Sequence, residues 1–257
     1  HYEVPPRLFE LVLGNKLKYS SGFWPEGVST LDQSENAMLN LTCERAGLVD
    51  GHDILELGCG WGSLTLFMAE HFPTSKITAV SNSIDQRQFI EARCGKLNLK
   101  NVEVITADMN DFETNKIFNR VVSIEMFEHM RNYEKLLGRV NTWLKSDGKL
   151  FVHIFSHQKA AYPFEDNDDG DWMAREFFSG GQMPSHRLLM SFPEQMKIEE
   201  DWRVSGVHYE RTSLSWLQKM DQNKAEVLEL FKKTYGEKDA GLWLQRWRIF
   251  FMSCEVL

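Results

Sequence analysis

Short runs of apolar and β-branched residues alternate with helical patterns between residues 53 and 155. The runs predict five strands, at 54–57, 76–80, 102–106, 120–124 and 149–155. Between them, apolar residues recur at helical spacing near 62–72, 84–97 and 132–145, which predicts three helices. Strands that alternate with helices in this way are typical of a parallel sheet.

The segments on either side of this series have other patterns. The N-terminal part is amphipathic and helical, and a further helix is predicted near 212–235. Between 157 and about 187, acids, glycines and aromatic residues replace regular periodicity, which predicts an inserted lid. The apolar run at 248–252 predicts a last strand. We therefore expect one domain in four parts: a helical cap (1–50), a core (51–155), a lid with a following strand (156–210), and C-terminal helices with the last strand (211–257).

The length and charge of the chain narrow the class of protein. At 257 residues the chain is near the upper limit for one hydrophobic core, so a second domain is not expected. The 29 basic and 37 acidic residues leave a net charge of −8, which repels nucleic acid and anionic membranes. No apolar run approaches the roughly 18 residues that a membrane span needs. We therefore expect neither a nucleic-acid partner nor stable membrane association.

The cysteines and the first residues bear on the compartment and the full length. Cys43, Cys59, Cys94 and Cys254 show no C-x-x-C spacing, so we expect reduced thiols and a cytoplasmic protein. The chain begins at His1 without an initiator Met, so we expect a longer native N-terminus. The oligomeric state is left open, and a homodimer is compatible with these features.

A glycine-rich loop follows the first predicted strand and precedes a predicted helix. Gly58, Gly60 and Gly62 are spaced G-x-G-x-G, whereas dinucleotide-binding loops have the spacing G-x-G-x-x-G. Glycines let a backbone approach a ligand closely, and the start of the helix offers unpaired N–H groups. The loop therefore predicts a nucleotide-like cofactor without a pyrophosphate, although a simple tight turn would have the same glycines.

Polar residues follow the second and third predicted strands. Asp108, after the third strand, can accept a hydrogen bond from an adenine amino group, although an exposed loop acid is the alternative. After the second strand, dinucleotide-binding proteins usually place an acid for the ribose. Asn82 and Gln86 stand there instead and offer amide groups. This difference disfavours a nicotinamide cofactor.

Several motifs resemble one known family. They are YSSGFW (19–24), LELGCGWG (55–62), EMFEHMRNY (125–133), EFF (176–178), and Asn82 with Gln86. Together they resemble the cyclopropane-fatty-acid-synthase-like methyltransferases, and among these the plant coclaurine, pavine and phenylalkylamine N-methyltransferases. The resemblance extends over essentially the whole chain. It implies an α/β, Rossmann-like class I methyltransferase with a mostly parallel seven-stranded sheet, a helical N-terminal segment and an inserted lid over the acceptor.

The resemblance also implies S-adenosyl-L-methionine as the cofactor and positions for it. The matching residues are Tyr19 and Ser20 near the methionine end, Gly58 and Gly60 under it, Asn82 and Gln86 at the ribose and adenosine, Asp108 and Met109 around the adenine, and Ile124 beneath.

Two glutamates and a histidine follow the fourth predicted strand, at the sheet edge where ligands bind in such folds. An aliphatic amine is mostly protonated near pH 7, so its proton must be removed before the nitrogen can attack a methyl group. We expect Glu128 to attract and orient the ammonium group, His129 to remove its proton, and Glu125 to add negative potential. The three residues could instead cap the following helix. Without a third ligand cluster, no metal site is expected.

The resemblance adds further residues and a competing activity. It implies Glu3 as another carboxylate facing the amine and Tyr209 as a pocket residue. In cyclopropane synthases, however, a glutamate, a histidine and a tyrosine hold a bicarbonate base at positions that match Glu128, His153 and Tyr209. Against this activity, Ser21 stands where those enzymes commonly have cysteine, and a net charge of −8 disfavours docking on an anionic bilayer.

We therefore predict an S-adenosylmethionine-dependent N-methyltransferase. Its acceptor is expected to be a small aromatic or alkaloid-like amine, of the phenylalkylamine or benzylisoquinoline type. Methyl or methylene transfer to an unsaturated lipid is the alternative. Two other classes also remain: a non-catalytic protein that binds the cofactor without turnover, and a nicotinamide dehydrogenase, which adenosylhomocysteine would not stabilise.

Overall fold

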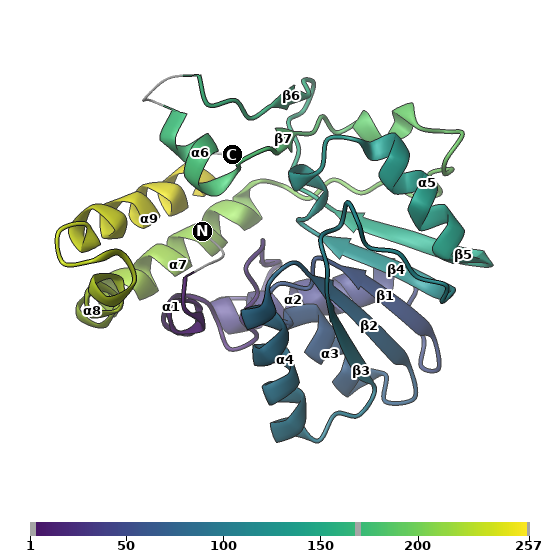
Figure 1. Ribbon diagram of the computed structural model, residues 1–257, viewed down its shortest axis with the longest axis horizontal. Helices are drawn as coiled ribbons and strands as arrows, with labels where there is room; N and C mark the ends of the chain where they lie inside the picture. Colours follow the sequence, from purple (N-terminus) through teal and green to yellow (C-terminus); the bar gives the residue numbers. More distant parts are fainter. Residues whose placement is uncertain (1–3, 168–170, 256–257) are drawn as a thin grey trace.

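The computed structural model describes residues 4–167 and 171–255. Their centre is a parallel sheet with the strand order β3-β2-β1-β4-β5 (Figure 1). The strands are β1 (Asp53–Leu57), β2 (Lys76–Ser81), β3 (Val102–Thr106), β4 (Phe118–Ile124) and β5 (Leu144–His153). The order reverses at β1 and β4, so the loops after these neighbouring strands diverge and leave a crevice for a ligand.

Helices cover both faces of this sheet. One face carries α2 (Leu31–Arg45), α3 (Ser63–His71) and α4 (Ile84–Leu97), and the other carries α5 (Tyr133–Trp143). Successive side chains of β1 alternate between the faces: Ile54 packs with α2 and α3, and Leu55 packs with α5. The predicted strand-helix series is therefore confirmed.

A second group of helices lies beside the sheet, on the left of Figure 1. It contains α1 (Pro6–Val12), α7 (Val207–Gln222), α8 (Lys224–Tyr235) and α9 (Ala240–Glu255), which share one hydrophobic core. The predicted N-terminal helical segment is confirmed by α1 and α2. The single helix predicted near 212–235 is divided at Asn223, whose side chain donates to the Leu11 carbonyl (2.9 Å) and to the Lys219 carbonyl (3.0 Å).

The last strand predicted at 248–252 is wrong, because this segment lies inside α9. The buried side chains are those of Trp247, Phe250, Phe251 and Cys254, at helical spacing, whereas Ile249 and Met252 are exposed. A strand would place residues 250 and 252 on the same face. The sheet of the described residues accordingly has five strands instead of seven.

The lid prediction falls on a segment with little regular structure. It contains β6 (Tyr162–Pro163) paired antiparallel with β7 (Gln182–Met183), α6 (Trp172–Phe177) and the 3-10 turn η3 (Leu188–Ser191). The strand predicted after the lid is wrong, because residues 192–206 form no strand and α7 begins at Val207.

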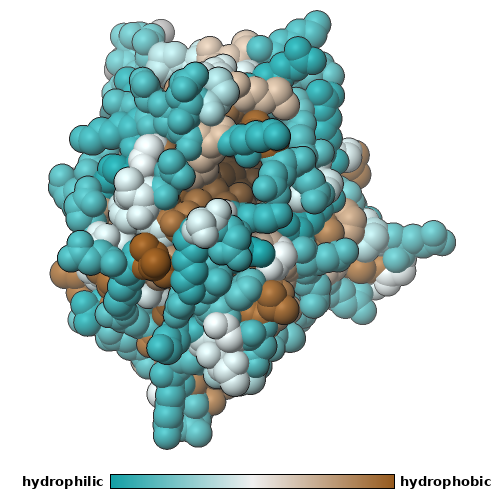
Figure 2. Space-filling view, turned by 90° about the vertical axis from the view of Figure 1, so that its right-hand side faces the viewer, coloured by the Kyte–Doolittle hydropathy of each residue, from teal (hydrophilic) through white to brown (hydrophobic). Residues whose placement is uncertain are grey.

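Hydrophilic side chains cover much of one face of the molecule (Figure 2). Figure 2 shows one face, on which hydrophilic side chains surround a hollow with hydrophobic residues in its depth. Among the described residues, none of the helices has the length and apolar character to cross a bilayer.

Candidate active site

A cavity of about 620 Å³ lies at the carboxyl ends of the strands. All nine residues predicted to bind the cofactor line it: Tyr19, Ser20, Gly58, Gly60, Asn82, Gln86, Asp108, Met109 and Ile124. They come from five separate segments of the chain. Parallel strands end at one edge of a sheet, so the loops after β1, β2, β3 and β4 converge there.

The glycine loop forms the floor of this cavity. Gly58 has a φ of +79°, and a Cβ on it would lie 2.7 Å from Met126, so no other residue fits without a shift. Gly60 has a φ of +52°, and an added Cβ would meet no atom within 4 Å. The loop is therefore packed against the protein at Gly58 and open at Gly60, where a ligand can approach the backbone.

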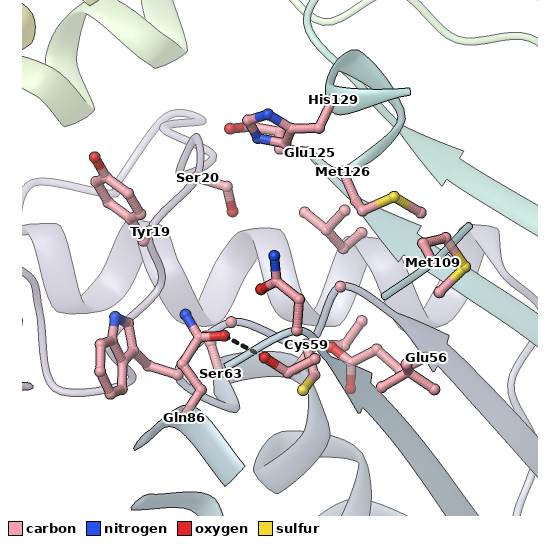
Figure 3. Close-up of a pocket in the computed structure, with 18 of the residues that line it drawn as sticks. Tyr19, Ser20, Glu56, Cys59, Ser63, Gln86, Met109, Glu125, Met126 and His129 are labelled. Carbon is pink, nitrogen blue, oxygen red and sulfur yellow. Dashed lines mark hydrogen bonds between the residues drawn. The ribbon is translucent and has the colours of Figure 1, made fainter. Parts of the chain in front are cut away.

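Hydrogen bonds hold the polar groups after β2 and β3 in place. Ser81 donates its hydroxyl to Gln86 Oε1 (2.5 Å), which orients the amide of Gln86 at the cavity (Figure 3). Asp108 Oδ1 accepts from the backbone N–H (2.7 Å) and the side-chain amide (2.9 Å) of Asn110. A buried hydroxyl at the cavity, Ser63 Oγ, has no hydrogen-bond partner among the described residues. These groups fit a ligand with several hydroxyl and amino groups, as a nucleoside has.

Two buried ionisable residues of the cavity were missed by the sequence analysis. Glu56 precedes the glycine loop and accepts a 2.5 Å hydrogen bond from the Thr65 hydroxyl, and burial raises its pKa to about 8. Lys18 precedes Tyr19 and is buried. Their positions beside the glycine loop and beside the Tyr-Ser motif were the available signals, but neither residue's burial can be read from the sequence.

Glu125 stands directly after β4 with a φ of +46°, and its side chain is 7% exposed. Its carboxylate accepts from the Ser21 backbone N–H (3.1 Å) and from the Tyr209 hydroxyl (3.1 Å). His153 Nε2 lies 3.9 Å from Glu125 Oε1. Burial raises the pKa of Glu125 above its ordinary value, and the charge of Lys18 and these two hydrogen bonds partly oppose this rise.

Glu128 lies in the 3-10 turn η1 (Phe127–His129) and is more deeply buried. Its Oε2 atom has no hydrogen-bond partner within the described part of the chain. Burial and the neighbouring charge of Glu125 raise the pKa of Glu128 well above its usual range. The two glutamates are therefore inequivalent: the hydrogen bonds and the charge of Lys18 favour the ionised form of Glu125, whereas burial and the charge of Glu125 favour the neutral form of Glu128.

His129 lines the same cavity as the glycine loop, whereas the side chain of Glu128 does not. In Figure 3, His129 and Glu125 lie together, across the cavity from Gln86 and Ser63. Burial lowers the pKa of His129. The imidazole is therefore neutral near pH 7 and able to accept a proton.

A second cavity, of about 730 Å³, adjoins the first at Glu125. His153 and Tyr209 line this second cavity, together with Ser21. Burial, with the charges of Lys18 and Arg45, lowers the pKa of His153 to about 3, so this imidazole is neutral. The structure thus places His153 and Tyr209 around Glu125, and the charge of Glu128 also acts on Tyr209.

Two further expectations concern Glu3 and a metal site. Glu3 lies outside the described residues. Among residues 4–167 and 171–255, no group of three or more histidine, cysteine, aspartate or glutamate side chains is arranged to hold a metal ion.

Comparison with known proteins gives the relationships of this chain. A family model described as mycolic acid cyclopropane synthetase matches residues 1–256. A pavine N-methyltransferase of Thalictrum flavum subsp. glaucum is 39% identical over 255 residues, which cover 98% of this chain and 72% of the relative. A cyclopropane-fatty-acyl-phospholipid synthase of Escherichia coli (strain K12) is 29% identical over 264 residues, covering 98% of this chain and 66% of the relative.

The fold is also that of a solved structure. A coclaurine N-methyltransferase bound to N-methylheliamine and S-adenosylhomocysteine superposes with a TM-score of 0.94 at 37% identity, over 99% of this chain and 74% of that chain. The family resemblance of the sequence motifs is thereby confirmed over nearly the whole chain. The chain belongs to the mycolic acid cyclopropane synthetase family of S-adenosylmethionine-dependent methyltransferases, together with the pavine and coclaurine N-methyltransferases.

Proposed function

We propose that this protein transfers a methyl group to the nitrogen of a small, alkaloid-like amine. The observation that carries the proposal is one cavity with the glycine loop on its floor and the Glu125–His129 pair across from it. Its relatives at 39% identity are named as pavine and coclaurine N-methyltransferases. Such a cavity can hold a nucleoside-containing methyl donor and the acceptor nitrogen side by side.

The cofactor is S-adenosyl-L-methionine, which supplies, when bound, an electrophilic methyl group on a sulfonium sulfur. The unpartnered Ser63 hydroxyl and the open backbone at Gly60 fit such a ligand. We propose that Gln86 and Asn82 bind its ribose and that Asp108 and Met109 contact its adenine. Tyr19 and Ser20 would then bind its methionine end.

The acceptor residues would handle the proton of the amine. An arriving ammonium group carries a positive charge, which ionised Glu125 attracts. The neutral imidazole of His129 takes the proton, which leaves the nitrogen lone pair free to form the N–CH₃ bond as the S–CH₃ bond breaks. Glu128, with its raised pKa, would serve as a neutral hydrogen-bond partner or ionise when the cation arrives. This assigns to Glu125 the attraction that the sequence analysis gave to Glu128.

The test is methyl transfer from labelled S-adenosylmethionine to a panel of phenylalkylamines and tetrahydroisoquinolines. Unsaturated phospholipid vesicles with bicarbonate serve as the competing acceptor. We expect label in an N-methylated amine and none in lipid. Label in lipid alone, dependent on bicarbonate, would overturn the proposal in favour of a cyclopropane synthase. Cofactor binding without turnover on either acceptor would instead indicate a non-catalytic protein.

We also propose a cytoplasmic location, because all four cysteines are buried free thiols, as in a reducing compartment. Fluorescence microscopy of the tagged full-length protein tests this, and labelling confined to an organelle or the cell exterior would contradict it.

A further inference from the structure

Lys18 is a buried cation next to the acceptor residues. Its exposure is 3%, and lysine is almost never this buried unless it is paired. Its ammonium donates to the Ser20 hydroxyl (2.5 Å) and to the Ser21 carbonyl (2.8 Å). The ammonium group therefore binds groups inside the protein and is shielded from solvent.

The backbone of the same loop is held by a second buried carboxylate, Glu35 of α2. Glu35 accepts from the backbone N–H groups of Gly14 (2.9 Å), Lys16 (2.9 Å) and Lys18 (3.3 Å). A Cβ on Gly14 would lie 2.6 Å from the Glu35 carboxyl group. The packing of the loop on α2 thus fixes the backbone of Lys18, from which its side chain extends to Ser20 and Ser21.

Ser21 links Lys18 to Glu125. Its carbonyl accepts from the lysine, and its N–H donates to the Glu125 carboxylate. The charged and titratable groups that face Glu125 from other elements are Lys18, His153 of β5, Tyr209 of α7, Cys254 of α9 and the neighbouring Glu128. His153, Tyr209 and Cys254 are neutral, since the pKa of His153 falls to about 3, that of Tyr209 is raised and that of Cys254 is raised to about 12. Lys18 is the cation among these groups, and burial lowers its pKa to about 8, which leaves it charged near pH 7.

We propose that Lys18 is a positioning residue for the transfer: through Ser21, its buried ammonium group holds the backbone N–H that binds Glu125, and its charge favours the ionised form of this carboxyl group. This inference rests on the proposed function for its catalytic meaning, but the link through Ser21 does not depend on the acceptor. An opposite charge at close range lowers the pKa of a carboxyl group by about 1 to 3 units. Without Lys18, burial would favour the protonated acid, and an ammonium substrate would meet no anion.

The test is a direct titration of Glu125 by NMR in protein labelled with [5-¹³C]glutamate. Glu125→Gln assigns the resonance. In Lys18→Met we expect the midpoint of Glu125 to rise by about one unit or more, and in Lys18→Arg to stay close to that of the wild type. Lys16→Met is the matched control, because Lys16 is in the same loop but pairs with Glu70 at the surface (3.2 Å).

An unchanged Glu125 midpoint in Lys18→Met overturns the inference. This holds even if the variant binds adenosylhomocysteine more weakly than the wild type. If Lys18→Met does not fold, the reciprocal titration replaces it. Coupled groups shift each other equally, so Glu125→Gln must lower the midpoint of Lys18, followed by the [6-¹³C]lysine resonance. No change in that midpoint also overturns the inference.

The pH profile of turnover separates positioning from a merely structural role. In Lys18→Met the acidic limb of kcat should move to higher pH by the same amount as the Glu125 midpoint, and Lys18→Arg should restore it. A uniform loss of kcat with an unmoved limb would contradict the inference. If no amine is methylated but the NMR shift is present, the proposed function fails and the electrostatic coupling of Lys18 to Glu125 stands.

Discussion

Two glutamates three residues apart have different environments in this site. Glu125 accepts hydrogen bonds from Ser21 and Tyr209, whereas Glu128 Oε2 has no partner among the described residues. Two nearby carboxyl groups do not both ionise easily, and the one with donors ionises first. The pair therefore titrates as a unit, with the first proton leaving Glu125.

His129 is expected to act on the acceptor and not on the cofactor. Replacing His129 with Ala should lower kcat by about 100-fold or more, the usual contribution of a general base, and leave the dissociation constant of adenosylhomocysteine nearly unchanged. Steady-state kinetics and calorimetry measure the two quantities. His52→Ala is the control, since His52 lies just before β1 and accepts a hydrogen bond from the Val49 backbone N–H. Normal turnover in His129→Ala would remove His129 from the mechanism.

Glu56 should make the stability of the protein depend on pH. Burial raises its pKa from 4.5 to about 8. The contribution of protonated Glu56 to the free energy of unfolding is therefore fully present below pH 4.5 and is lost as the pH rises to about 8. Each unit of difference between the folded and unfolded pKa corresponds to about 1.4 kcal/mol. Glu56→Gln, which cannot ionise, should therefore gain stability relative to the wild type as pH rises through this window.

The measurement is urea denaturation of both proteins at several pH values between 4.5 and 8. Thr65→Val is a useful companion, because it removes the hydroxyl that stabilises the ionised form of Glu56. A difference between wild type and Glu56→Gln that does not vary with pH would show that Glu56 is ionised in the folded protein at all these pH values.

At the scale of elements, α9 completes the core of the C-terminal helices. Phe177 of α6 stacks on Phe250 of α9, with ring centroids 4.3 Å apart. Trp247 and Phe251 are buried in the same cluster, together with Trp216 of α7. The aromatic residues of the lid region are thus partly ordinary core, and Phe177 also borders the cofactor cavity.

Substitutions in α9 test its helical burial pattern. Phe251→Ala should cost about 3 to 5 kcal/mol of unfolding free energy, as for other buried phenylalanines. Met252→Ala, next to it and 41% exposed, should change stability by no more than about 0.5 kcal/mol. Urea denaturation measures both. Equal losses at the two positions would contradict the helix.

At the scale of the whole molecule, the cavity is lined jointly by the edge of the sheet, the N-terminal loop and the lid. Its lining includes Ser20 before α2, Gln86 of α4, and Arg175 and Phe177 of α6. A ligand that contacts all of these segments binds the folded chain only, so it must raise the stability of the entire domain.

Adenosylhomocysteine should therefore raise the melting temperature. At a concentration 100 times its dissociation constant it adds about 2.7 kcal/mol, which is about 5 °C or more for a chain of this size. Asn82→Ala should reduce the shift without lowering the melting temperature of the free protein, because Asn82 is exposed. Thermal unfolding with and without ligand measures this. A shift with a nicotinamide dinucleotide and none with adenosylhomocysteine would favour a dehydrogenase.

Some of this architecture follows from the sequence alone. The five core strands and three helices between them are visible because burial in a parallel sheet imposes apolar runs, and helices impose a period of 3.6 residues. The glycine loop and the polar residues after β2 and β3 are visible because parallel strands bring their carboxyl ends together. All nine predicted cofactor residues accordingly line one cavity.

Other features were decided only by the tertiary structure. The apolar run at 248–252 is short enough to suit a strand or a helix, and its packing against Trp216 and Phe177 selects the helix. The different environments of Glu125 and Glu128, and the burial of Lys18, depend on residues far away in the chain. Local sequence determines backbone preference and periodicity, but the solvation and charge of a side chain depend on which distant groups the fold places around it.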